Sequence, residues 1–326
     1  MESAKKKPSV VIVTPGTREA NNGNWRTAQR WAGYLAPECD VIVQSAWQGE
    51  SADLMIALHA RRSHASIAAF RAAHPRLPVI VALTGTDLYR DLPDDRDARD
   101  SLAIASKLIV LQDDAPRQVP LRWRRKCHVV YQSARILEPA AKPADRLDCI
   151  VVGHLRAEKD PLAAARALAL IPRDVPVYVH HVGEALDATL GAAVRDAARR
   201  DPRYRWIGGL PHGLARAAIK EAHLLVHPSL LDGGANVIAE AVTAGTPVVA
   251  SRISGNVGML GANYPGYFEV GDASGLAALL VSLLEHPERF RELTLGCASR
   301  MPLFRPERER DTLMGLVLPA ARKARR

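Results

Sequence analysis

The residues best suited to chemistry lie in the segment 229–246, where a loop with two glycines leads into a helical pattern. Asp232 precedes Gly233 and Gly234 in this loop, and Glu240 follows Asp232 by eight residues. Glycine lets a backbone approach a ligand closely, and the first free N–H groups of a helix point toward an anion. Carboxylates accept hydrogen bonds from sugar and ribose hydroxyls. The pattern predicts a nucleotide-sugar site; the structural alternative is a glycine-rich turn in which Asp232 satisfies backbone donors.

The spacing in this segment resembles that of a known family. Seven residues separate the acid Asp232 from Glu240. The run Ala-x-x-Ala-Gly-Thr-Pro-Val-Val follows Glu240 directly. This run resembles the donor-site signature of the GT-B glycosyltransferases related to sucrose and glycogen synthases (glycosyltransferase family 4). The resemblance implies that Glu240 binds the ribose hydroxyls, that Asp232 contacts the transferred sugar, and that the next backbone amides hold sugar and phosphate. The family usually has Glu where this chain has Asp232, so the shorter side chain could change the sugar preference.

A second element of the same family lies in the segment 152–161. It resembles the family's strand–Gly–Arg–Leu…Glu–Lys–Gly motif, whose Arg and Lys clamp the nucleotide diphosphate. Lys159 matches directly, whereas His154 occupies the usual Arg position and Arg156 follows two residues later. Which of the two replaces the missing Arg is left open, as is the alternative that Lys159 is a surface residue after a strand. Cationic contacts to the leaving group strengthen as its charge grows, so they lower the barrier as well as tightening binding.

A further polar run follows the strand-like segment 247–250, and it either completes the donor pocket or forms a structural turn. The residues expected to bind the donor are Gly233, Gly234, Ala235, Asn236, Glu240, Arg252, Ser254 and Asn256. The residues expected to assist the transfer are Lys159, His154, Arg156 and Asp232.

Polar residues also follow three strand-like runs in the first half of the chain. One group opens a helical pattern after the polar loop 14–23, the second follows the run 54–58, and the third follows the run 79–83. A loose turn and a solvated basic turn are the structural alternatives for the first two. The residues expected to bind the acceptor are Asn24, Arg26, Thr27, His59, Arg61, Arg62, Thr84, Thr86 and Asp87. Many family relatives have a His near the position of Thr84, so no obvious general base comes from that strand.

Several motifs indicate a narrower group, because together they resemble the selenosugar synthases of selenoneine biosynthesis. The runs that carry this resemblance are 24–28, 58–63, 83–92, 153–161, 232–237 and 251–258. It implies that a UDP-sugar, with N-acetylglucosamine as the sugar, reacts with selenophosphate to form a carbon–selenium bond while UDP and phosphate leave. Selenophosphate is already anionic and nucleophilic, so it needs cations more than a base, which fits Thr84 and the Arg61–Arg62 pair. The alternatives are a transferase with a hydroxyl acceptor (glycan or lipid) and a non-catalytic sugar-nucleotide binding module.

The elements that position these residues follow from the alternation of short apolar runs with helical patterns. Such alternation implies parallel sheets with right-handed crossovers, whose ligands lie at the carboxyl ends of the strands. The expected strands are 9–14, 40–44, 54–58, 79–83, 108–111, 128–131, 149–152, 175–182, 204–207, 224–226 and 247–250. The expected helices are 24–35, 63–73, 161–170, 187–200, 214–222, 235–243, 274–285, 287–297 and 308–322.

Two such series imply two domains. The segment 138–147 contains two prolines and no periodicity, so we expect it to be a linker. We expect an N-terminal acceptor-binding lobe at 8–137, a C-terminal UDP-sugar-binding lobe at 148–300, and a C-terminal helix with a basic tail at 301–326. The expected fold class is α/β, a GT-B fold with two Rossmann-like lobes whose parallel sheets face each other across a cleft.

The charge distribution argues against nucleic acid as a partner. The net charge is +9, of which residues 1–7 contribute +2 and residues 320–326 contribute +4, leaving +3 for the rest. Terminal basic tails are usually solvated, and the internal cluster at 117–126 has one aromatic residue and no groove-binding motif. A modestly positive remainder suits small anionic substrates. We therefore expect UDP-sugar and selenophosphate as partners, and no nucleic acid.

The cysteine spacing and the apolar runs of the chain predict its compartment and its cofactor requirement. The four cysteines, Cys39, Cys127, Cys149 and Cys297, have no zinc or redox spacing and are expected to be buried thiols in a reducing compartment. No apolar signal region follows the N-terminal lysines, and the apolar runs are too short to span a bilayer. We expect a cytoplasmic protein without stable membrane association. We expect no cofactor and no metal, because cations and a helix terminus can hold a diphosphate. The anomeric outcome and the oligomeric state stay open.

Overall fold

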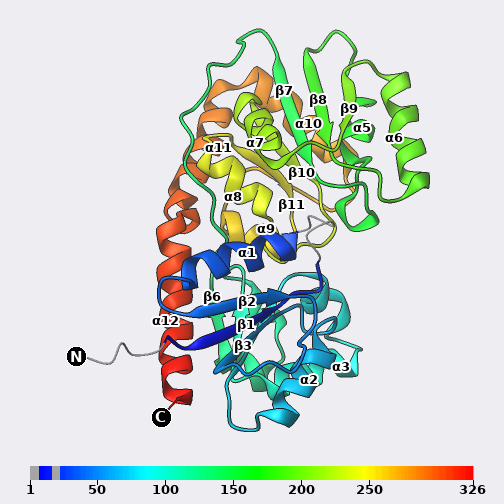
Figure 1. Ribbon diagram of the computed structural model, residues 1–326. Coiled ribbons are helices and arrows are strands. Elements are labelled where there is room, and N and C mark those ends of the chain that lie inside the picture. Colours follow the sequence, from blue (N-terminus) through cyan, green and yellow to red (C-terminus); the bar gives the residue numbers. More distant parts are fainter. Residues whose placement is uncertain (1–6, 17–22, 326) are drawn as a thin grey trace. The chain divides into compact units, whose positions relative to one another are not determined.

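The computed structural model describes residues 7–16 and 23–325 (Figure 1). The chain divides into two compact units. The first comprises Met1–Gln132 together with Pro306–Arg326, and the second comprises Ser133–Arg305. The last helix therefore belongs to the same unit as the N-terminal strands. The N-terminal lysines at positions 5 and 6 and the last residue of the basic tail lie outside the described residues.

In the first unit, six parallel strands form one sheet in the order β2-β1-β3-β4-β5-β6. The strands are β1 (Ser9–Val13), β2 (Asp40–Gln44), β3 (Leu54–Leu58), β4 (Val79–Leu83), β5 (Lys107–Val110) and β6 (Cys127–Val129). The helices are α1 (Gly23–Leu35), α2 (His64–Ala73), the π-helix η1 (Asp87–Asp91), α3 (Arg96–Ile104), α4 (Ala115–Gln118), the 3-10 helix η2 (Leu121–Lys126) and α12 (Pro306–Ala324). Because β3 and β4 are buried along their whole lengths, they consist of apolar residues without alternation.

Successive residues of these strands pack on opposite faces of the sheet, as the period of a strand requires. On one face, Val11 and Met55 share a cluster with apolar residues of α2 and α3. On the other face, Val10 and Ile56 share a cluster with apolar residues of α1 and α12. The sheet is thus covered by helices on both faces.

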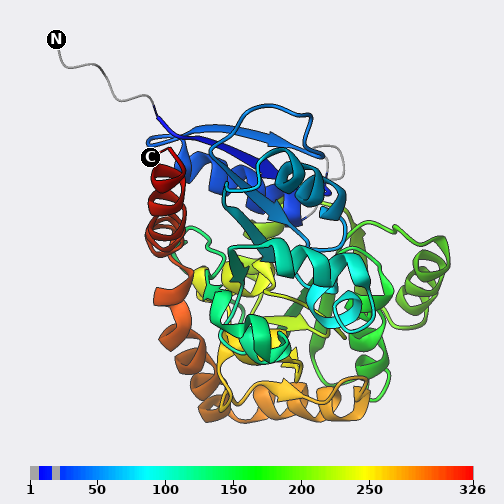
Figure 2. The same ribbon diagram turned by 90° about the horizontal axis from the view of Figure 1, so that it is seen from below.

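Helix α12 is anchored to α1 by a buried carboxylate, and the two helices lie side by side in both views (Figures 1 and 2). Glu309, which is 1% exposed, accepts two hydrogen bonds from the Arg30 guanidinium at 2.8 and 3.1 Å and one from the Trp31 indole at 2.8 Å. Leu313 and Val317, further along α12, are fully buried against the sheet. The C-terminal helix is therefore part of the core of the first unit.

The second unit repeats the architecture with a six-stranded parallel sheet in the order β12-β11-β10-β7-β8-β9. Its strands are β7 (Leu147–Val152), β8 (Val177–Val182), β9 (Tyr204–Gly208), β10 (Leu224–His227), β11 (Val248–Ser251) and β12 (Tyr267–Phe268). Its helices are η3 (Ala157–Lys159), α5 (Ala163–Leu168), α6 (Ala188–Arg200), α7 (His212–Glu221), α8 (Asn236–Thr243), α9 (Ser254–Leu260), α10 (Ala273–Glu285), α11 (Pro287–Arg300) and η4 (Met301–Phe304).

The α/β class with two parallel sheets is confirmed, and every expected strand is present. Eight elements of the described residues were not expected: η1, α3, α4, η2, η3, α9, β12 and η4. The N-terminal part of the first unit ends at Gln132, and β7 begins at Leu147, within the segment expected to be a linker. Within the described residues, no helix has both the length and the apolar character needed to cross a membrane.

Candidate functional site

The donor-site residues of the second unit gather at the carboxyl ends of β7 and β10, which are neighbours in the sheet. Lys159 ends η3, the short helix after β7, and Asp232 lies in the loop after β10. The Lys159 ammonium donates a short hydrogen bond to Asp232 Oδ2, forming an ion pair. The two loops are also joined through the backbone, because the N–H of Leu230 donates to the carbonyl of Glu158 at 2.9 Å. Sheet order thus brings together two residues that are 73 positions apart.

His227, the last residue of β10, completes this cluster. Its Nε2 lies 3.3 Å from Asp232 Oδ2 and 3.1 Å from the hydroxyl oxygen of Ser229. Burial lowers the pKa of His227 against the opposing effect of Asp232, so the imidazole is neutral near pH 7. Burial would raise the pKa of Asp232, but the charge of Lys159 and the hydrogen bond from His227 outweigh it and hold that pKa well below its usual range. Asp232 is therefore ionised.

Helix α8 begins beside this cluster and offers an N-terminus without a side-chain cap. The residue at the N-cap position is Ala235, which has no side-chain oxygen to offer to the first N–H groups. Gly233, Gly234 and Ala235 are buried, and Asn236 is partly exposed. The first turn of α8 thus presents backbone donors and a positive dipole end at the mouth of the loop.

Glu240 lies one turn further along α8 and contacts α7. Its Oε1 is 2.7 Å from Nε2 of His212, the first residue of α7. Arg216 of the same helix donates to the carbonyl of Arg135 at 2.8 Å, and its Nε has no hydrogen-bond partner although it is buried. Burial lowers the pKa of Arg216, and the nearby Glu240 raises it in part.

The segment after β11 is a helix rather than a turn or an open loop. Ser254 begins α9, and a Cβ on Gly255 would lie 2.0 Å from the carbonyl oxygen of Asp232. Only glycine permits this approach of the two backbones. Asn256 is fully buried and donates to the carbonyl of Ser251 at 2.9 Å, while its own Oδ1 has no partner. The half-exposed Arg252 stacks on Tyr267 instead, with 4.7 Å between the guanidinium carbon and the ring centroid.

His154 and Arg156 lie on the segment between β7 and η3. His154 Nδ1 accepts a hydrogen bond from the N–H of Glu184 at 3.1 Å, and Arg156 is exposed at the start of η3. The close contact of this segment with the loop after β8 requires Gly183, where a Cβ would lie 1.9 Å from the carbonyl oxygen of Gly153. The choice between His154 and Arg156 as a diphosphate ligand stays a prediction.

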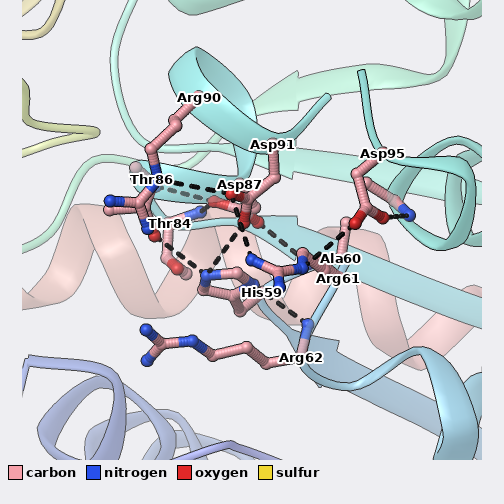
Figure 3. A network of polar contacts seen from close by, with 12 residues as sticks. His59, Ala60, Arg61, Arg62, Thr84, Thr86, Asp87, Arg90, Asp91 and Asp95 are labelled. Atoms are coloured by element: carbon pink, nitrogen blue, oxygen red, sulfur yellow. Dashed lines mark hydrogen bonds and ion pairs between the residues drawn. The ribbon is translucent and has the colours of Figure 1, made fainter. Parts of the chain in front are cut away.

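The predicted acceptor residues of the first unit lie at the carboxyl ends of β3 and β4 (Figure 3). His59 follows β3 with φ of 71°, a left-handed conformation that is strained for a residue with a Cβ. The N–H of Arg62 donates to His59 Nδ1 at 3.2 Å, so in the neutral ring Nε2 carries the proton and donates to the Thr86 hydroxyl at 2.9 Å. Burial lowers the pKa of His59 against the opposing effect of Asp87, which keeps the ring neutral.

Asp87 is fully buried and holds the loops together. Its carboxylate accepts backbone N–H groups from Ala60, Thr84 and Gly85, each at 2.9 Å. Three such hydrogen bonds use most of the acceptor capacity of a carboxylate. Asp87 therefore fixes Thr84 and the end of β4, and its predicted contact with an acceptor stays a prediction.

Asp91, one turn later in η1, is 6% exposed and was not anticipated. Its Oδ1 lies 3.4 Å from both Arg61 and Arg90, whereas its Oδ2 has no hydrogen-bond partner and lies 3.9 Å from His59 Nε2. Arg61 also pairs with Asp95 at 3.1 Å. Arg62 is exposed, and Figure 3 shows its guanidinium pointing away from the carboxylates. The two neighbouring arginines are therefore not equivalent.

The third predicted acceptor group opens α1. Asn24 and Arg26 are partly exposed, whereas Thr27 is fully buried. The Thr27 hydroxyl donates to the carbonyl of Gly23 at 2.9 Å and accepts from the amide of Gln132 at 2.7 Å. Residues 17–22 of the polar loop before this helix lie outside the described residues.

A comparison with known families matches the second unit. The family model described as "Glycosyl transferases group 1" matches residues 133–294, which include the whole donor cluster. Residues 133–294 therefore match the group 1 glycosyl transferases.

Solved structures match the chain at the level of the fold. Sucrose-phosphate synthase from Thermosynechococcus elongatus has a TM-score of 0.79 at 16% identity, covering 98% of this chain and 100% of that one. Anabaena HepE in complex with UDP and glucose has a TM-score of 0.77 at 15% identity, covering 96% and 100%. A glycosyltransferase from Rickettsia africae has a TM-score of 0.69 at 11% identity, covering 99% of both chains. The predicted GT-B fold is thereby confirmed.

Sequence patterns did not identify four residues of these sites, His227, His212, Arg216 and Asp91. His227 ends a strand and His212 begins a helix, and these placements were the available signal. The four cysteines are free, three of them buried. In the described part of the chain, no three His, Cys, Asp or Glu side chains group as metal ligands would.

Proposed function

We propose that the protein transfers a sugar from a UDP-sugar that binds in the second unit. The observation that carries this proposal is the convergence of the Lys159 ammonium and the uncapped N-terminus of α8 at the carboxyl ends of β7 and β10. A cation and a helix N-terminus together suit a diphosphate. Crystal structures of HepE, which has the same fold, contain UDP with glucose or UDP-glucose, and this supports the choice of nucleotide.

The residues of the second unit would act mainly on the leaving group. As the bond between the anomeric carbon and the UDP oxygen breaks, negative charge grows on the diphosphate. Lys159 and the α8 amides stabilise that charge more strongly in the transition state than in the ground state, which lowers the barrier. Glu240, whose carboxylate lies at the α7–α8 contact, would accept hydrogen bonds from the ribose hydroxyls.

The acceptor in this proposal is selenophosphate, and the sugar is N-acetylglucosamine. The selenium atom attacks the anomeric carbon while UDP leaves, and water then cleaves the selenium–phosphorus bond so that phosphate leaves. Support comes from the sequence resemblance to selenosugar synthases and from the cations after β3, above all the exposed Arg62. Thr84, where many relatives have a His, fits a nucleophile that needs no base.

A hydroxyl acceptor is the second candidate, and one observation favours it. The buried Oδ2 of Asp91 has no hydrogen-bond partner, and a carboxylate oxygen of this kind can accept a hydrogen bond from an alcohol. The same negative charge would oppose an anionic acceptor, although Arg61 and Arg90 offset it at Oδ1.

Mass spectrometry of reaction mixtures separates these proposals. The protein is incubated with UDP-N-acetylglucosamine, UDP-glucose or UDP-galactose, each with selenophosphate, thiophosphate, an alcohol such as glycerol, or no acceptor. We expect UDP release together with a selenium-bearing sugar, and slower formation of the sulfur analogue. UDP release that requires an alcohol and yields no selenosugar would refute the selenophosphate assignment but not the donor assignment. A protein that binds UDP and transfers no sugar to any acceptor tested would support the non-catalytic alternative.

A further inference from the structure

Asp232 makes contacts that do not fit its expected role at the sugar. The carboxylate uses one oxygen, Oδ2, for both the Lys159 ammonium and the His227 ring nitrogen. The Asp232 side chain is 12% exposed, against 31% for Lys159. Of the two members of the ion pair, the lysine is therefore the one more accessible to a ligand.

The backbone around Asp232 is held on two sides. The carbonyl oxygen of Asp232 lies so close to α9 that a Cβ on Gly255 would be 2.0 Å away. At the start of the loop, the Ser251 hydroxyl donates to the carbonyl of Ser229. The side-chain amide of Asn256 in turn donates to the carbonyl of Ser251. A carboxylate on such a fixed backbone presents a fixed partner to the flexible Lys159 side chain.

We infer that Asp232 is a positioning residue that orients the Lys159 ammonium toward the donor diphosphate, rather than a ligand of the transferred sugar. This inference rests on the proposed function, in which the diphosphate binds beside Lys159. An ammonium group has three hydrogens, so a hydrogen bond to Asp232 leaves two for phosphate oxygens. The long lysine side chain loses rotamer freedom when it binds a ligand, and the ion pair removes much of that freedom in advance.

His227 serves the same purpose from the buried side. Its neutral ring donates a hydrogen bond to the carboxylate without adding a positive charge that would weaken the attraction between Asp232 and Lys159. The expected consequence is that substitution of Asp232 affects all UDP-sugars alike, because it acts through the diphosphate. Sugar selection then falls to other groups, such as the backbone amides at the start of α8.

Binding of UDP tests the inference, because UDP has the diphosphate but no sugar. Isothermal titration calorimetry compares the wild type with Asp232→Asn, Lys159→Met and the double variant. We expect Asp232→Asn to weaken UDP binding about tenfold and Lys159→Met at least as much. The double variant should bind UDP no more weakly than Lys159→Met alone, since the effect of Asp232 requires the lysine. Asp272→Asn, at the N-cap of α10, is the matched control and should bind UDP normally.

Asp232→Glu is the conservative variant, and it keeps a carboxylate for Lys159 if the neutral variant fails to fold. It should bind UDP within about threefold of the wild type. Unchanged UDP binding by Asp232→Asn together with weaker UDP-sugar binding would overturn the inference in favour of a sugar contact. Tighter UDP binding by Asp232→Asn would overturn it too, because the carboxylate would then compete with the diphosphate. Wild-type protein that does not bind UDP would instead refute the donor proposal itself.

Discussion

Replacement of Glu309 by Ala should destabilise the first unit more than any surface substitution on the same helix. Glu309 is 1% exposed and accepts hydrogen bonds from the Arg30 guanidinium and the Trp31 indole. Breaking a buried ion pair by removing one partner costs about 3–5 kcal/mol. The Arg30 side chain is 22% exposed and can regain water, which favours the lower end of that range. The Trp31 indole N–H is fully buried and would lose its acceptor, at about 1–3 kcal/mol.

We therefore expect Glu309→Ala to lower the free energy of unfolding by about 3 kcal/mol and Glu309→Gln by about half as much. The glutamine keeps an acceptor for the indole and loses the charge. Urea unfolding followed by tryptophan fluorescence reports on this unit, because four of the five tryptophans lie in it. Glu307→Ala, an exposed position in the first turn of α12, is the control and should change the free energy by less than about 0.5 kcal/mol. A loss below about 1 kcal/mol for Glu309→Ala would refute the view that this carboxylate anchors α12.

Four further outcomes are expected. Gly255→Ala should destabilise the second unit by about 1–3 kcal/mol, measured by urea unfolding, because its Cβ would overlap the Asp232 carbonyl. Glu240→Gln should lower the preference for UDP over 2′-deoxy-UDP by about tenfold in calorimetry, since a charged acceptor for ribose is lost. His181→Gln should flatten the pH dependence of unfolding between about pH 4 and 6.5, because burial lowers the pKa of His181 to about 4. Arg62→Ala should raise the KM for selenophosphate about tenfold and leave the KM for the UDP-sugar unchanged.

The sign of the His181 prediction follows from proton binding. The unfolded chain takes up a proton near pH 6.5 and the folded chain only near pH 4, so stability falls as pH decreases through this window, by about 3 kcal/mol at most. An unchanged slope in His181→Gln would contradict this account.

Gly213→Ala, where nothing lies within 4 Å of the added Cβ, is the control for Gly255→Ala. Because alanine has a higher helix propensity than glycine, Gly213→Ala should not lower the stability, and equal losses in both variants would refute the overlap account.

The strands other than β12 were predictable because each is a short apolar run that needs no tertiary information. The predicted bounds of β2, β3 and β4 agree with the structure at both ends. Helix α9 was not predictable in this way, since Ser254–Leu260 contains two glycines and has low intrinsic helix propensity. Its position depends on the contact between Gly255 and the Asp232 backbone, which lies far away in the sequence.

The same limit applies to the candidate site. Lys159 and Asp232 were each predicted from their own motifs, but their ion pair depends on β7 and β10 being neighbours in the sheet. Local patterns do not determine strand order. The π-helix η1 is a similar case, because Asp87 at its start binds the backbone of Ala60 after β3. A hydrogen bond between two loops leaves no periodic signal in either.

The structure also changes how the basic pair after β3 is understood. From sequence, Arg61 and Arg62 were equivalent candidates for holding an anionic acceptor. Arg61 lies 3.4 Å from Asp91 and 3.1 Å from Asp95, so an incoming anion would have to compete with two carboxylates for it. Arg62 is exposed, and its side chain points away from those acids. Because a cation that is already neutralised attracts an anion weakly, an anionic acceptor would depend on Arg62 far more than on Arg61, whose charge balances the buried Asp91.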